Sequence, residues 1–160
     1  MAKIENIKFA EGPYNTTDII NVSASVGVNG VNRSEDIIIV QALLKYGLEG
    51  RTEFRDAEFP EPSGAFVKTT AKLIKKYQRF NNRSEGVRVS IDGRIDPLTG
   101  SVFAYGKKKH WTIYSLNVHA EEMSLVYYNT PLIEGICKRW PFIGEMLNKN
   151  GVGTLGLPLE

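Results

Sequence analysis

The fold is decided by the stretch Thr70-x-x-Leu73-Ile74-x-x-Tyr77-Gln78, followed by Asp92-Gly93-Arg94-Ile95-Asp96-Pro97 and then Trp111-Thr112-Ile113-Tyr114-Ser115-Leu116-Asn117. The first and last parts carry apolar residues at helical spacing, and the middle part holds the turn-forming pair Asp92-Gly93. An upstream stretch, Asn32-x-x-x-Asp36-Ile37-x-x-Val40-Gln41-x-Leu43-Leu44, repeats the helical spacing. The pattern predicts three short helices and two loops that form one small unit.

These motifs resemble the peptidoglycan-binding-like family, a small three-helix cell-wall module. The most similar variant carries Asp-Gly-Arg-Ile/Val-Asp-Pro before its last helix and often occurs beside bacterial secreted effectors. The resemblance covers residues 26–117 and implies a mainly α fold with a ligand cleft among the helices and the Asp-Gly loops. The chain departs from the family at 60–66, Pro-Glu-Pro-Ser-Gly-Ala-Phe, which keeps the glycine and the aromatic residue of the first loop but not its acidic turn.

The domain organisation follows from the limits of that unit. Residues 1–25 are expected to be an N-terminal extended segment, because 3–10 and 18–26 suit short strands better than helices. Residues 26–117 form the peptidoglycan-binding-like module, and 118–160 form a helical C-terminal extension. The predicted fold is therefore mainly α, with short strands at its edges.

The first helix is predicted at about 34–46, with Asn32 or Ser34 as the N-cap and Gly47 as the stop signal. Its apolar face is formed by Ile37, Val40 and Leu44. The charged, proline-containing stretch 49–63 that follows is predicted to be a loop of more than median length.

The second helix is predicted at about 64–81, ending at Asn81-Asn82. Its core-facing stripe comprises Phe66, Thr70, Leu73, Ile74, Tyr77 and Phe80. The alternation Val87-Arg88-Val89-Ser90-Ile91 then predicts a short strand that runs into the Asp92-Gly93 turn.

The C-terminal extension carries several further helix signals. Residues 121–128 are compatible with a helix, and Thr130-Pro131 suits the start of another, with threonine as N-cap and proline in the first position. Trp140-Pro141 breaks that pattern, and a last short helix is expected to close near Gly151. These helices are apolar enough to need a covering surface, so they either fold back on the module or dock a second protein.

Two glutamines hint at an internal repeat, since Val40-Gln41 and Tyr77-Gln78 occupy equivalent places in their helices. The family is also built as a pseudo-repeat. Two interpretations are open for Gln41 and Gln78: they hydrogen-bond loop backbone, or they help to hold a glycan or a peptide stem.

Composition limits the function classes. Twenty basic and eighteen acidic residues give a net charge of +2, which is too balanced to indicate nucleic-acid binding. The local basic runs, at 107–110 and around Lys72 and Lys76, are interpreted as solvated faces. The sequence shows no classical export signal and no apolar segment of membrane-spanning length. If the protein works on a cell wall, it travels by a signal-independent secretion machine, is released by lysis, or has had a leader removed.

Catalytic and metal-binding patterns are weak. The single cysteine, Cys137, lies on an apolar helical stripe, which favours a buried structural residue over a nucleophile served by His110 or His119. The two histidines are nine positions apart and form no paired metal-ligand spacing. No phosphate loop, dinucleotide fingerprint or nucleophile elbow is present, and no local signature selects a glycosidase carboxylate pair. We therefore expect neither a cofactor nor a metal.

Recognition is what remains. A wall-binding cleft needs hydrogen-bonding groups above an aromatic or apolar floor. The resemblance places the candidates around the Asp-Gly loop: Arg79, Asp92, Arg94, Asp96 and Tyr105. Each has a structural alternative, because the aspartates suit Asx-type turns, Arg94 suits a bridge to them, and Tyr105 suits packing.

Three functions are compatible with these patterns. The first is a non-catalytic module that binds peptidoglycan or a muropeptide and positions a bacterial envelope-acting or secreted protein, in the periplasm or cell envelope after signal-independent export and in the cytoplasm before it. The second is a structural component of a secretion or phage-like injection system, with a secretion-apparatus protein or a catalytic partner bound to the C-terminal helices. The third is a small wall hydrolase with catalytic groups in 118–160. None involves nucleic acid or a membrane.

Overall fold

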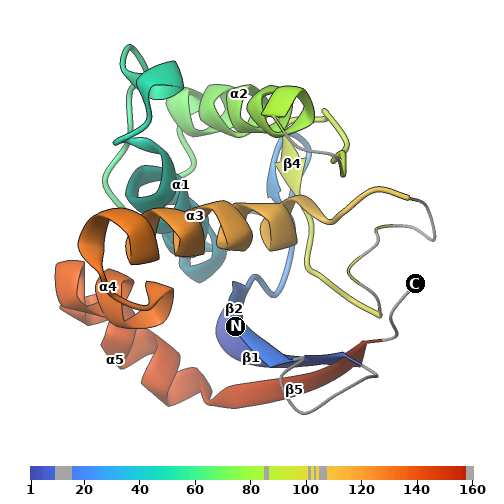
Figure 1. Cartoon of the computed structure of the whole chain (residues 1–160), viewed down its shortest axis with the longest axis vertical. Coiled ribbons are helices and arrows are strands. Elements are labelled where there is room, and N and C mark those ends of the chain that lie inside the picture. The colour runs from blue at the N-terminus through green and yellow to red at the C-terminus, as the bar shows by residue number, and fades with distance from the viewer. Residues whose placement is uncertain (10–15, 85–86, 101, 103, 105–107, 158–160) are drawn as a thin grey trace.

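The computed structural model describes residues 1–9, 16–84, 87–100, 102, 104 and 108–157. Within that part, the fold is mainly helical, as predicted, and its short strands form two small sheets (Figure 1). The helices are α1 (Ser34–Leu48), α2 (Lys68–Ser84), α3 (Thr112–Tyr128), α4 (Leu132–Arg139) and α5 (Pro141–Asn150), with a 3-10 turn, η1 (Thr52–Phe54). The strands are β1 (Lys3–Phe9), β2 (Thr16–Asn21), β3 (Val26–Gly27), β4 (Arg94–Ile95) and β5 (Val152–Leu157).

Helix α1 is the centre of the core. Ile37, Ile39, Val40, Leu43 and Leu44 are all at most 2% exposed, so the helix is buried on nearly every side rather than along a single stripe. Its predicted bounds are close to the observed ones, but Gly47 does not end it. Gly47 lies inside α1, and a Cβ atom there would come within 3.0 Å of the Cβ of Ala120 in α3. This glycine therefore permits the close approach of α1 and α3.

Helix α2 begins later than predicted, at Lys68 instead of residue 64. Gly64 adopts a positive φ of 80°, which a helix cannot contain. Phe66 consequently lies before the helix, half-buried against the core and not on the helical stripe.

The predicted N-caps of α1 are also wrong: Arg33 is in the N-cap position, while the Asn32 side chain accepts a hydrogen bond from the Gly27 amide (2.8 Å).

The predicted strand at 87–91 is not formed as such; the strand is β4, which pairs with β3 through Val26–Ile95 and Gly27–Arg94. Arg88 makes only an isolated bridge to Lys109. The reason is local: the Asn82 side chain bonds both backbone groups of Val89, accepting from its amide (2.8 Å) and donating to its carbonyl (2.9 Å). The Asn82 side chain, at the end of α2, thus makes the backbone hydrogen bonds that a neighbouring strand would otherwise make.

The helix signals around Trp111–Asn117 and 121–128 belong to one helix, α3, which ends at Asn129 in a left-handed conformation. Helix α4 starts at Leu132, where the backbone amide donates to Glu121 Oε2 (3.0 Å) instead of to a Thr130 cap. The predicted break at Trp140-Pro141 separates α4 from α5, and α5 ends before Gly151 as expected.

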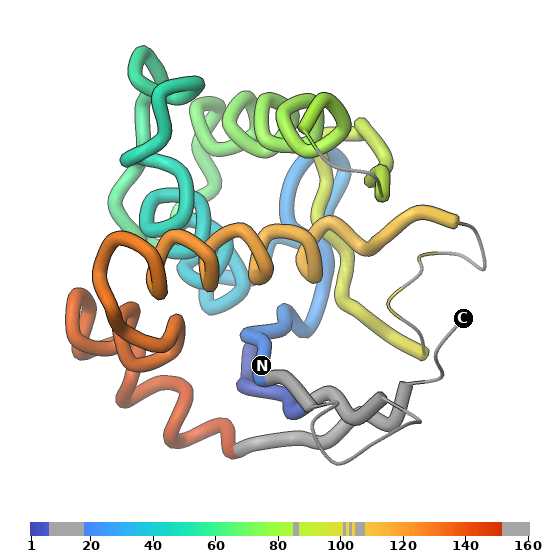
Figure 2. Tube along the Cα trace, in the orientation of Figure 1, coloured from blue at the N-terminus to red at the C-terminus, as the bar shows by residue number. Residues whose placement is uncertain are grey.

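The C-terminal extension is not wholly helical, because β5 follows α5. It lies parallel to β1, with Ile4 opposite Val152, while β2 lies antiparallel on the other side of β1, giving the order β2-β1-β5. Strands from the beginning and the end of the described chain therefore lie in one sheet, which Figure 1 shows on the opposite side of the molecule from α2. Figure 2 traces the same view, with α2 (green) at the top and α5 (red) at the lower left. In the described part of the chain, no helix combines the length and the apolar character that a bilayer span requires.

Candidate functional site

The Asp-Gly loop, the predicted site, is organised by its own side chains. Asp92 Oδ1 accepts hydrogen bonds from the Arg94 amide (3.0 Å) and from Gln78 Nε2 (3.0 Å). Arg94 Nε lies 3.0 Å from Asp96 Oδ1, and its NH2 group donates to Asp96 Oδ2 (3.4 Å). Asp92 therefore forms an Asx-type turn, and Arg94 forms an ion pair with Asp96. These are the structural alternatives to ligand binding that the sequence offers for these residues.

The space at this loop is small. Asp92, Arg94 and Asp96 line a hollow of about 10 Å³ together with residues of the segment before α3 and its first turn. That volume corresponds to about one water molecule. The structure thus brings three predicted residues together, and ligand contact by them stays a prediction.

Arg79 is not among the described residues that line this hollow. Arg79 is exposed on the outer face of α2, and Tyr105 lies outside the described residues.

Two glutamines hold the two loops in the same way, which gives the repeat a physical basis. Gln78 is fully buried; its Oε1 accepts from the amides of Asp92 (3.2 Å) and Gly93 (2.8 Å). Its Nε2 donates to the Arg94 carbonyl (3.0 Å) and to Thr112 Oγ1 at the start of α3 (3.2 Å).

Gln41 repeats this arrangement one helix earlier. It accepts from the amides of Ser63 (3.0 Å) and Gly64 (3.4 Å), and it donates to the Ala65 carbonyl (3.1 Å) and to Thr70 Oγ1 in α2 (3.2 Å). The interpretation that both glutamines hydrogen-bond loop backbone is confirmed. Their amides have no group left to offer a ligand in this arrangement.

A larger site lies between α2 and α3, and we call it the α2–α3 cleft. Its volume is about 340 Å³, in the range of small-molecule sites. It is lined by Asn81, Val87, His110, Tyr114, Ser115, Val118, His119 and Glu122. Most of these residues come from one face of α3, where positions four apart are neighbours, and the end of α2 and the segment after it form the opposite wall.

The floor of the cleft is aromatic and apolar. The ring of His110 meets that of Tyr114 edge to face, with centroids 5.0 Å apart, and Val118 is 48% exposed beside them. Burial lowers the pKa of His110 and raises the pKa of Tyr114. Both rings are therefore uncharged at neutral pH.

His119 forms a rigid part of the wall. It is 4% exposed, and its Nδ1 lies 2.8 Å from the Tyr77 hydroxyl and 3.1 Å from the Ser115 carbonyl oxygen. Because a carbonyl can only accept, we assign the Nδ1 proton to this side of the ring. The buried Tyr77 and the helix backbone together fix the orientation of the imidazole.

The rim of the cleft is charge-balanced. Arg51 NH2 donates to the His119 carbonyl (3.1 Å) and lies 4.0 Å from Glu122 Oε2. Uncharged rings below a balanced rim suit an uncharged ligand that carries amide and hydroxyl groups.

The pKa shift of His110 gives a testable pH dependence. Its folded pKa lies below the ordinary 6.5, so at pH values just under 6.5 the unfolded chain binds a proton that the folded chain does not. The free energy of unfolding should therefore fall as the pH is lowered from 6.5 toward the folded pKa. In urea titrations across this window, His110→Gln should show a shallower fall than the parent protein; identical slopes would contradict the assignment.

Catalytic signals stay weak in the structure. Cys137 is half-buried, and not fully buried as predicted; burial raises the pKa of its thiol, and the residue packs against Gly144 of α5. Among the described residues, no three His, Cys, Asp or Glu side chains gather as metal ligands would.

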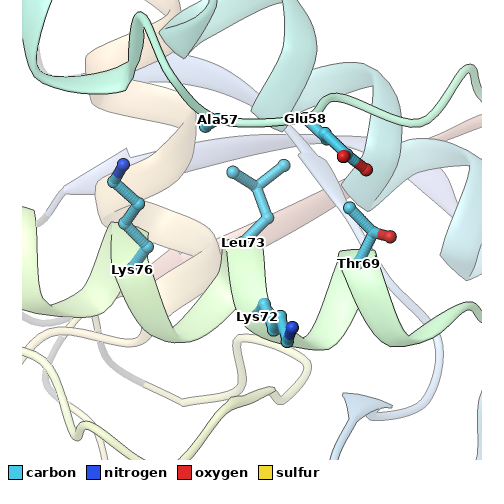
Figure 3. Close-up of a pocket in the computed structure, with 6 residues that line it drawn as sticks. All are labelled: Ala57, Glu58, Thr69, Lys72, Leu73 and Lys76. Carbon is cyan, nitrogen blue, oxygen red and sulfur yellow. The ribbon is translucent and has the colours of Figure 1, made fainter.

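Two further surface features flank the site. A groove of about 250 Å³ runs between α2 and the loop after η1, lined by Ala57, Glu58, Thr69, Lys72, Leu73 and Lys76 (Figure 3). At the other end of α3, four consecutive apolar residues are exposed: Leu125 (50%), Val126 (68%), Tyr127 (71%) and Tyr128 (44%).

Sequence reasoning missed the cleft because it weighed His110 and His119 only as metal ligands or bases. The available signal was the spacing of Tyr114, Val118 and Glu122, which are four apart and so lie along one side of a helix.

Comparisons of the chain with protein-family models, with curated proteins and with solved structures found no match.

Proposed function

We propose that this chain is a non-catalytic peptidoglycan-binding module that positions a bacterial envelope-acting or secreted protein. The observation that carries the proposal is the α2–α3 cleft, where uncharged His110 and Tyr114 rings lie below a hydrogen-bonding wall. Such a surface suits amino-sugar rings, which present apolar faces and acetamido groups. The paired Gln41 and Gln78 arrangements agree with the internal repeat implied by the family resemblance.

The proposal moves the expected ligand from the Asp-Gly loop to the cleft. Asp92, Arg94 and Asp96 then act by fixing the loop that leads toward α3, since Gln78 links that loop to Thr112. The protein would work in the periplasm or cell envelope after signal-independent export.

A matched pair of substitutions on α3 tests the cleft. Val118 and Val126 are both exposed, but Val118 lines the cleft and Val126 does not. Arginine is well tolerated on a helix surface, so neither change should unfold the protein. In co-sedimentation with purified sacculi, Val118→Arg should weaken binding by about tenfold or more because its side chain fills the cleft, while Val126→Arg binds like the parent.

Equal binding by both variants would contradict ligand binding in the α2–α3 cleft. Failure of the folded parent protein to sediment with sacculi would overturn the wall-binding function itself.

The exposed end of α3 favours a second candidate, a protein-interaction component of a secretion or injection system. Four consecutive exposed apolar residues, Leu125 to Tyr128, form a surface that protein partners commonly cover. In this case Val126→Arg, and not Val118→Arg, would disrupt a complex with the partner protein in size-exclusion chromatography.

A further inference from the structure

The outer face of α2 is cationic along its whole length. The helix contains six Lys and Arg residues and no Asp or Glu. Five of the six are exposed and follow one another at steps of three or four: Lys68, Lys72, Lys75, Arg79 and Arg83. With a rise of about 1.5 Å per residue, they form a stripe about 22 Å long. We call it the α2 stripe.

This arrangement works against the stability of the helix. Lys68 and Lys72, Lys75 and Arg79, and Arg79 and Arg83 are like-charge pairs four apart, which repel. Lys68 also places a positive charge at the positive end of the helix dipole. These charges lower the stability of the helix, and their exposed side chains are not needed for packing. Such a departure from local sequence preferences is typical of functional surfaces.

Acidic neighbours do not relieve the repulsion. Some exposed cations elsewhere form ion pairs, such as Lys138 with Glu134 (3.0 Å) and Arg139 with Glu49 (2.6 Å). Across the part of the chain that the structure describes, the α2 stripe has no ion pair. Figure 3 shows Glu58 on the loop across the groove, with the Lys72 side chain extending away from it.

We propose that the α2 stripe binds a flexible phosphodiester polymer, such as poly(glycerol phosphate), in which uncharged units separate the negatively charged phosphates. The charges of the stripe recur at an axial rise of about 4.5–6 Å, so several can meet successive phosphates of one extended chain. Lysine, a compact point charge on a flexible stem, tolerates a polymer without fixed geometry.

The composition of the stripe separates this occupant from two others. Except for Ser84, every exposed residue of α2 is Lys or Arg. Single-stranded nucleic acid is also held by stacking on aromatic side chains, and a helix that lies in a membrane interface inserts apolar side chains. The stripe offers neither.

The cationic surface continues beyond the helix. Arg88 and Lys109 are both exposed, and their backbones form an isolated β-bridge. The hydrogen bonds between Asn82 and Val89 hold this segment against the end of α2. The inference is independent of the proposed wall-binding cleft, since no residue of the stripe lines that cleft.

Binding of short poly(glycerol phosphate), measured by calorimetry over a series of salt concentrations, tests the proposal. Lys72→Gln/Lys75→Gln should raise the dissociation constant about tenfold and reduce the slope of log affinity against log salt by about 1.4, which is about 0.7 for each charge removed. The matched control, Lys138→Gln/Lys149→Gln, removes the same charge from exposed sites elsewhere and should leave affinity within about twofold.

Equal losses in the two double variants, or no binding by the parent protein at low salt, would overturn the proposal. Tighter binding of oligo(dT) than of poly(glycerol phosphate) would assign the stripe to nucleic acid, and binding only to phosphatidylglycerol vesicles would assign it to a membrane surface; either result overturns the polymer. Val118→Arg should bind the polymer like the parent, so a failure of polymer binding and a failure of wall binding in the cleft can be told apart.

Lys72→Glu excludes unfolding as the cause of lost binding. It replaces repulsion with Lys68 and Lys76 by attraction at four-residue spacing. The variant should therefore lose polymer binding while its urea midpoint rises. A lower midpoint would contradict the claim that the stripe is kept at a cost to stability.

Discussion

Replacing Gln78 with leucine is expected to destabilise the protein by about 4 kcal/mol, because several buried polar groups lose their partner at once. The Gln78 side chain is fully buried and bonds the Gly93 amide, the Arg94 carbonyl and Thr112 Oγ1. Leucine has a similar volume, so the effect measures lost hydrogen bonds more than a cavity. The measurement is the free energy of unfolding from urea titration.

Gln41→Leu is the matched control for that experiment. Gln41 makes the same set of bonds, but two of its loop partners, Ser63 and Ala65, are exposed and can bond water instead. We expect about half the loss, about 2 kcal/mol. A cost below about 1 kcal/mol for Gln78→Leu would show that the loop does not depend on this side chain.

Gly135→Ala is the second large effect, expected to destabilise by about 3 kcal/mol although alanine is normally favoured in helices by about 1 kcal/mol. A Cβ at Gly135 in α4 would overlap the Tyr46 hydroxyl of α1. That hydroxyl cannot move freely, because it shares a hydrogen bond of 2.8 Å with Ser124 Oγ in α3. The change should therefore force α4 away from α1, and thermal unfolding monitored by circular dichroism would detect it.

Two variants sharpen this test. Gly144→Ala in α5 places its Cβ 3.3 Å from that of Cys137, a tight contact without overlap, and should shift the melting temperature by at most about 3 °C. Tyr46→Phe removes the obstructing oxygen, so it should recover part of the loss in the double variant with Gly135→Ala. Strictly additive effects of the two changes would contradict the proposed clash.

Local patterns in the sequence predicted the helices well. Helical apolar spacing located α1 and most of α2, and Trp140-Pro141 marked the junction of α4 and α5. Errors appeared where a distant contact decides the role of a residue. Gly47 resembles a helix stop, but its role depends on Ala120 in α3, and the strand at 152–157 depends on the free edge of β1 at the other end of the chain.

The candidate site shows the same division. Asp92-Gly93 correctly predicted a turn, since its geometry is set by neighbouring residues. The α2–α3 cleft was not predicted, because it forms only when α3 brings Tyr114 and Val118 opposite Asn81 and Val87. A motif locates a turn, whereas a cleft requires the packing of two helices.

In the proposed function, the α2–α3 cleft holds a wall fragment. The most direct measurement is a titration of isotope-labelled protein with soluble muropeptides, followed by amide chemical shifts in nuclear magnetic resonance spectra. We expect progressive shifts at Tyr114, Ser115 and Val118, which line the cleft, and little change at Val126 on the same helix. Shifts confined to Asp92, Arg94 and Asp96 would return the site to the Asp-Gly loop, and a spectrum without shifts would contradict wall binding.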